Sequence, residues 1–186
     1  MIKIESAIKE HLATIENITE QVETIRQIGM AFVNTIQNGG KIIWMGNGGS
    51  AADSQHLAAE LVGRFEIERP GYPSIALTTD SSILTAVAND FGFERIFERQ
   101  IESLCHSGDV VVGLSTSGNS PNILKGLQMA GKVGAITVGF TGIDGGALPD
   151  LVQHMFRAQS SSTPRIQEAH IFVGHMLCQY VEEALA

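Results

Sequence analysis

Short apolar segments alternate with helical ones along most of this chain, and that alternation is the strongest constraint on its fold. The apolar runs lie at 41–45, 74–77, 109–114 and 135–139, with a weaker one at 153–157. The helical patterns lie at 50–64, 81–88, 93–105, 120–130 and 164–185. Buried strands this short between helices predict a parallel sheet covered on both faces. We expect one α/β domain over 1–186: a three-layer α/β/α sandwich with a central, mostly parallel five-stranded sheet.

A helical segment precedes the first strand. Apolar residues recur at three- and four-residue intervals over 4–37, and Gly39-Gly40 ends the pattern. Asn17 followed by Glu20 has the spacing of a capping box, which would divide the segment into two helices. A small sheet cannot cover all of this surface, so residues 1–38 are expected to form a helical extension that meets a partner subunit.

Composition excludes several classes of protein. Lys and Arg number 12 against 20 Asp and Glu, a net charge of −8, which disfavours nucleic acid and membrane surfaces as partners. The longest uncharged stretch, 110–124, is too polar for a membrane helix, and the N-terminus has no signal-peptide pattern. Cys105 and Cys178 lie in no CxxC motif and are expected to be reduced thiols. These features predict a cytoplasmic protein.

Two turns rich in glycine and serine each connect a predicted strand to a predicted helix, at 46–50 and at 115–120. Free N–H groups and the helix dipole favour an anion at such a position, and hydroxyls add donors. Each turn alone is also compatible with an ordinary tight turn or N-cap. Neither has the spacing of a P-loop or a dinucleotide-binding fingerprint, since no lysine follows Gly49. The pair therefore predicts a small phosphorylated ligand.

Titratable side chains gather on two of the predicted helices. His56 and Glu60 are four residues apart and share a helix face, so they are compatible with a metal site, with proton transfer or with an ordinary solvated pair. The last helix offers Gln167, Glu168, His170 and His175. Helical spacing alone does not determine which of these four face a ligand.

The motifs together resemble a known family. They are GNGGSAADSQHLAAEL at 46–61, RPGY at 69–72, NDFG at 89–92, STSGNS at 115–120, and RIQE at 165–168 with His175. In order and spacing they resemble the sugar-isomerase (SIS) family with its flavodoxin-like fold, and within it the phosphoheptose isomerases. The resemblance implies a homotetramer with active sites at subunit interfaces. It also implies conversion of D-sedoheptulose 7-phosphate to D-glycero-D-manno-heptose 7-phosphate, an early step toward the heptose of lipopolysaccharide cores.

The resemblance also assigns site residues. It implies one zinc ion per subunit held by His56, Glu60, Gln167 and His175, with Glu60 and His175 as the acid/base pair. It implies that the sugar phosphate is held by Asn47, Gly48, Gly49, Ser50, Glu60, Asn89, Asp90, Ser115, Thr116, Ser117, Ser120 and Gln167. Arg64, Arg69 and Arg165 are candidates for offsetting the negative charge near a dianionic substrate.

These assignments lead to a hypothesis for the reaction, an aldose–ketose isomerisation through an enediol. Glu60 would remove the proton from carbon, and His175 would move a proton between the two oxygens. Zinc would polarise the carbonyl. A zinc-bound histidine is a poorer proton shuttle, so the roles of His175 as ligand and as acid/base compete.

Two alternatives share the scaffold. One is a non-catalytic member of the family that binds the replication initiator protein; we disfavour it because this sequence has all four of the His, Glu, Gln and His residues. The other is an isomerase or binding module for an arabinose, hexulose or N-acetylmuramate phosphate. Fold alone does not separate these functions, because they depend on the site.

Overall fold

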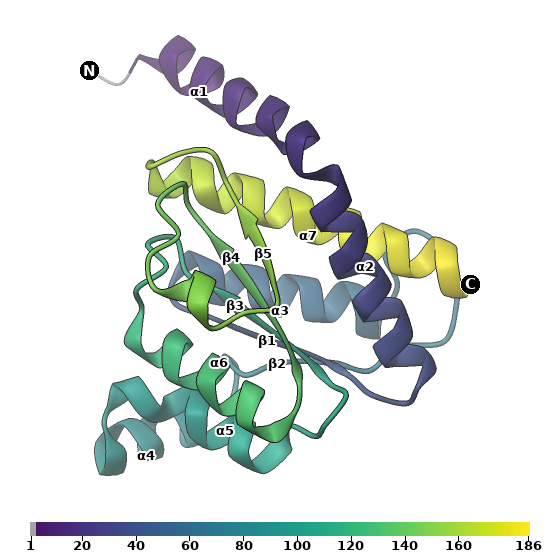
Figure 1. The fold of residues 1–186 in the computed structure, drawn as a ribbon, viewed down its shortest axis with the longest axis vertical. Coiled ribbons are helices and arrows are strands. Elements are labelled where there is room, and N and C mark those ends of the chain that lie inside the picture. The colour runs from purple at the N-terminus through teal and green to yellow at the C-terminus, as the bar shows by residue number, and fades with distance from the viewer. Residues whose placement is uncertain (1–2) are drawn as a thin grey trace.

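A computed structural model of the chain describes residues 3–186 (Figure 1). The helices are α1 (Ile4–Glu16), α2 (Val22–Gln37), α3 (Gly49–Val62), α4 (Ser81–Phe91), α5 (Ile96–Leu104), α6 (Pro121–Val133) and α7 (Thr163–Leu185). The strands are β1 (Ile42–Gly46), β2 (Ser74–Ala76), β3 (Val110–Leu114), β4 (Ile136–Thr141) and β5 (His154–Arg157). Short 3₁₀ segments lie at Asn17–Gln21, Phe93–Arg95 and Leu148–Asp150.

The five strands form one sheet in the order β2-β1-β3-β4-β5, and each neighbouring pair is parallel. This confirms the predicted three-layer sandwich. Alternate residues of β1 face opposite layers: Ile42 and Trp44 pack with α2, α3 and α7, while Ile43 and Met45 pack with α5 and α6. Burial on both faces explains why these strands are continuous apolar runs.

The strand order reverses between β1 and β3, since the chain adds β2 on one side of β1 and β3 on the other. In an open α/β sheet a crevice for ligands forms outside the carboxyl ends of the strands at such a reversal. The two glycine- and serine-rich turns follow β1 and β3 directly. The topology therefore brings both turns to the same edge of the sheet.

Two local expectations are corrected. The N-terminal segment is two helices, as expected, but Asn17 is not an N-cap: it ends α1, and its Nδ2 donates to the Ala13 carbonyl at 2.8 Å. A 3₁₀ turn that contains Glu20 joins α1 to α2 without a side-chain cap. The expected turn at 89–92 begins later, because α4 continues through Phe91 and ends at Gly92, whose φ is 92°.

Helices α1 and α4 pack little of their surface against the rest of the chain. On α1, Ile4, Ile8 and Leu12 are 68%, 54% and 60% exposed, and α1 extends beyond the sheet in Figure 1. No residue of α4 is buried, although the helix is largely apolar. Within residues 3–186, no helix has the length and the apolar character needed to cross a membrane. The role of 1–38 as an oligomerisation extension stays a prediction, and residues 1–2 lie outside the described part of the chain.

Candidate metal and active site

Helices α3 and α7 pack side by side and in parallel. Gln167 lies against Gly49 near the start of both helices, and His175 lies against His56 farther along. Gly174 permits this approach: a Cβ at that position would lie 2.5 Å from both Cδ atoms of Leu57. The close contact brings side chains that are far apart in sequence to one place.

Three donor atoms converge where the helices meet. His175 Nε2 lies 3.0 Å from His56 Nε2, and His56 Nε2 lies 3.1 Å from Glu60 Oε1. All three ligand atoms fall within 4.8 Å of one another. Burial and the neighbouring His56 lower the pKa of His175, while Glu60 opposes the shift. Two imidazole nitrogens and a carboxylate oxygen are ligands that zinc takes in proteins, so this donor set fits a zinc ion.

The remaining polar residues of α7 have other partners. Glu168 accepts a hydrogen bond from Arg165 and lies 2.7 Å from Nδ1 of His11. His170 is completely buried against Phe140 and Phe156, and burial lowers its pKa to about 4. Of the two histidines that helical spacing left open, His175 joins the donor cluster and His170 does not. Gln167 as a fourth ligand stays a prediction.

A pair of amides joins the two turns. Asn47 Nδ2 donates to Asn122 Oδ1 at 2.9 Å, and Asn122 Nδ2 donates back to Asn47 Oδ1 at 2.8 Å. Asn122 is 2% exposed, and its Oδ1 also accepts the N–H of Ile123. Asn122 was not among the residues predicted from the sequence, although its place in the first turn of a helix that follows a glycine- and serine-rich turn was an available signal.

The second turn borders a cavity. Ser115 and Ser120 bond each other at 3.0 Å, whereas Thr116 and Ser117 line a cavity of about 270 Å³. Across it lie segments 142–144 and 160–163. Ser117 Oγ accepts the backbone N–H of Asn119 at 3.2 Å. Hydroxyls near the start of a helix can donate to an anionic ligand, so this cavity favours one.

Comparisons with known proteins identify the family of this chain. The SIS domain family model matches residues 7–142. The phosphoheptose isomerase of Aquifex aeolicus is 52% identical over 172 residues, covering 92% of this chain and 88% of that protein, and the one of Aneurinibacillus thermoaerophilus is 48% identical over 185 residues, covering 96% and 93%. The structure of the Neisseria gonorrhoeae phosphoheptose isomerase superposes with a TM-score of 0.91 at 35% identity, covering 97% of each chain. The chain belongs to the phosphoheptose isomerase family.

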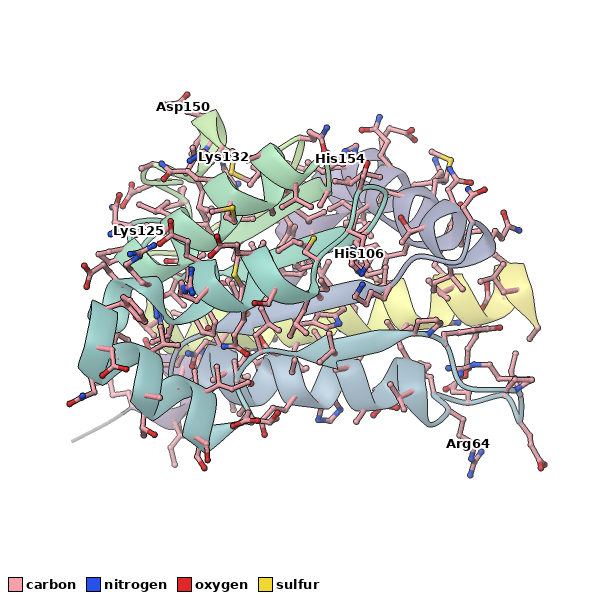
Figure 2. The ribbon with its side chains drawn as sticks, turned by 90° about the horizontal axis from the view of Figure 1, so that it is seen from below. Arg64, His106, Lys125, Lys132, Asp150 and His154 are labelled. Atoms are coloured by element: carbon pink, nitrogen blue, oxygen red, sulfur yellow. The ribbon has the colours of Figure 1, made fainter. Side chains whose placement is uncertain are left out.

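Two of the three arginines that were candidates for offsetting the negative charge near the substrate are engaged within the chain. Arg69 is buried against Glu182, and Arg165 is bound to Glu168 and to the Ala7 carbonyl. Arg64 is exposed, and Figure 2 shows its side chain directed away from the rest of the molecule. Arg69 and Arg165 therefore pair with carboxylates of the chain rather than with a ligand.

Three further polar residues of this phosphoheptose isomerase family member concern the site. Asn89 and Asp90 lie exposed at the end of α4, where Asn89 Nδ2 donates to Asp90 Oδ1 at 2.8 Å. Asp53, which the sequence analysis did not select, lies one turn before His56 and has a buried Oδ2 without a partner. Burial raises the pKa of Asp53 to about 6, against the opposing effect of His56.

Proposed function

We propose that this chain converts D-sedoheptulose 7-phosphate to D-glycero-D-manno-heptose 7-phosphate through an enediol. The observation that carries the proposal is the convergence of His56, Glu60 and His175 in a member of the phosphoheptose isomerase family. The two ligand turns at the same sheet edge support it. The alternative function, a regulator that binds the replication initiator protein, receives no support from these relatives.

The two turns would bind the substrate through groups that are distant from its reacting carbons. The hydroxyls of Thr116 and Ser117, which line the cavity, would donate to the phosphate near the start of α6. Gly48, Gly49 and Ser50 would contact the sugar from the first turn, with Asn47 held in place by Asn122. Binding energy at the phosphate end would then orient the carbonyl end toward Glu60.

Glu60 and His175 would carry the proton transfers. Glu60 would take the proton from the carbon beside the carbonyl and return it to the neighbouring carbon. His175, on the opposite helix, would move a proton between the two oxygens. A zinc ion held by His56, Glu60 and His175, with Gln167 as the proposed fourth ligand, would supply Lewis-acid polarisation of the carbonyl.

The active enzyme would be a homotetramer with its sites at subunit interfaces. The exposed apolar residues of α1 and the absence of any buried residue in α4 support contact with other copies. Asn89 and Asp90 would then reach a site that includes a neighbouring subunit. We expect a cytoplasmic enzyme whose product enters heptose synthesis for lipopolysaccharide.

The test is proton NMR of the purified protein with sedoheptulose 7-phosphate, before and after chelation and after zinc is returned. Formation of heptose 7-phosphate, lost on chelation and restored by zinc, is the expected result. No product from the folded protein under any of these conditions would refute the proposed reaction. Product that is indifferent to chelation would refute the metal assignment alone.

A further inference from the structure

A buried ion pair lies behind the donor cluster. Arg69 Nε lies 2.9 Å from Glu182 Oε1, and the two side chains are 2% and 1% exposed. Arg69 belongs to the connection between α3 and β2, and Glu182 lies near the end of α7. The pair therefore ties together the two helices that carry the site.

Glu182 organises the chain that leaves α3. Its carboxylate accepts the backbone N–H groups of Phe65, Glu66 and Ile67 at 2.7, 2.8 and 3.0 Å. Burial opposes ionisation, but these three hydrogen bonds and Arg69 lower the pKa of Glu182. The carboxylate is thus charged and fully engaged, and it fixes the backbone of three consecutive residues.

Arg69 completes the end of α3. Its NH1 donates to the Leu61 carbonyl at 2.8 Å, and its NH2 donates to the Glu60 carbonyl at 3.0 Å. The last carbonyls of a helix have no partner within the helix, so these bonds hold the turn that carries Glu60. The guanidinium also lies 4.0 Å from the centre of the Tyr72 ring, which restricts its orientation.

Phe65 transmits the arrangement to the second helix. Its backbone N–H is held by Glu182, and its ring lies 5.5 Å from the His175 ring, centroid to centroid, with 33° between the planes. The His56 ring is the second neighbour, with its centroid 5.0 Å from that of His175. The imidazole of His175 therefore packs against both Phe65 and His56.

We propose that Arg69, Glu182 and Phe65 are positioning residues that set the separation of Glu60 and His175. The inference rests on the proposed isomerase function for its effect on turnover. Arg69 holds the backbone of Glu60, and Glu182, through Phe65, holds the ring of His175. Because proton transfer depends steeply on geometry, displacement of either group lowers kcat more than it raises KM.

The chain offers a matched control for stability. Asp109 is 2% exposed, pairs with Lys41 at 2.6 Å, and accepts the backbone N–H groups of Lys41 and His106. It precedes β3, at the edge of the sheet opposite the ligand turns. Glu182→Gln and Asp109→Asn therefore remove a similar buried carboxylate, one connected to the site and one remote from it.

The experiment measures kcat, KM, thermal unfolding and zinc affinity by calorimetry for the wild type and four variants. Glu182→Gln is expected to lower kcat at least tenfold and to weaken zinc binding at least fivefold, with KM within threefold of the wild type. Asp109→Asn is expected to change kcat, KM and zinc affinity less than twofold each. Phe65→Leu is expected to lower kcat at least fivefold with little change in unfolding temperature, and Phe65→Tyr, which keeps the ring, to restore wild-type kcat.

Wild-type kcat in Phe65→Leu, or equal losses of kcat in Glu182→Gln and Asp109→Asn, would overturn the positioning role. If Glu182→Gln does not fold, the two Phe65 variants decide the question. If the wild type gives no turnover, the proposed function fails, and zinc affinity in the same variants still tests the positioning: equal affinity in the wild type and Phe65→Leu would overturn it.

Discussion

Glu60→Gln separates the chemistry at this site from its stability. The amide has nearly the shape of the carboxylate but cannot accept a proton from carbon. A positioned base contributes about 100- to 10,000-fold to a proton transfer. At about 1.4 kcal/mol for each factor of ten, the substitution should raise the barrier by about 3–5 kcal/mol.

The cost to folding is much smaller. Glu60 and His56 are 24% and 51% exposed, and an exposed pair at this spacing is worth about 0.3–0.5 kcal/mol. For a chain of this length that corresponds to a change in unfolding temperature of about 1–2 °C. Sugar phosphate binding should persist, since the proposed phosphate contacts lie in the turn at 115–120.

The assay follows product by NMR with zinc in excess, so that weakened metal binding does not limit the rate. In D₂O the wild type should also exchange the transferred proton with solvent, and Glu60→Gln should not. Glu102→Gln is the control, because it removes an exposed helical ion pair with Arg99 on α5. Turnover of Glu60→Gln within threefold of wild type would refute the assignment of Glu60 as the carbon base.

Three further predictions concern stability. Asn122→Ala should lower the free energy of unfolding by about 1–3 kcal/mol, measured with urea, because it leaves the amide of Asn47 unpaired. Burial lowers the pKa of His170 from 6.5 to about 4, so the imidazole binds a proton more tightly in the unfolded chain than in the folded one. The stabilisation of the folded chain by neutral His170 is therefore present above pH 6.5, and the free energy of unfolding falls by ~3 kcal/mol toward pH 4. When the free energy of unfolding is measured between pH 4 and 7, it should fall less steeply with decreasing pH for His170→Leu than for the wild type. An equally steep fall would exclude His170 as the cause. Zinc at about a hundredfold its Kd should raise the free energy of unfolding by about 2.7 kcal/mol in calorimetry, and His56→Ala should abolish that increase; a full increase in His56→Ala would remove His56 from the metal site.

Local patterns predicted most of the architecture. The strand at 109–114 was recognisable because both of its faces are buried, which makes it apolar throughout. Asn17 was misassigned because an asparagine that caps a following helix and one that ends a preceding helix look alike in sequence. The end of α4 was placed too early for a similar reason, since Asn89 and Asp90 are common in turns but continue this helix.

The sequence by itself determined the parallel α/β class, the two glycine- and serine-rich turns between strand and helix, and the shared face of His56 and Glu60, because these depend on periodicity and on neighbours a few residues apart. Helical spacing did not choose between His170 and His175; the family resemblance selected His175, and the tertiary structure places it with His56 and Glu60 while His170 is buried, since the answer depends on how α7 is rotated against α3. The tertiary structure also decided that Arg69 forms an ion pair with Glu182 rather than with a ligand. Burial and the pairing of distant charges are properties of packing, and no local pattern encodes them.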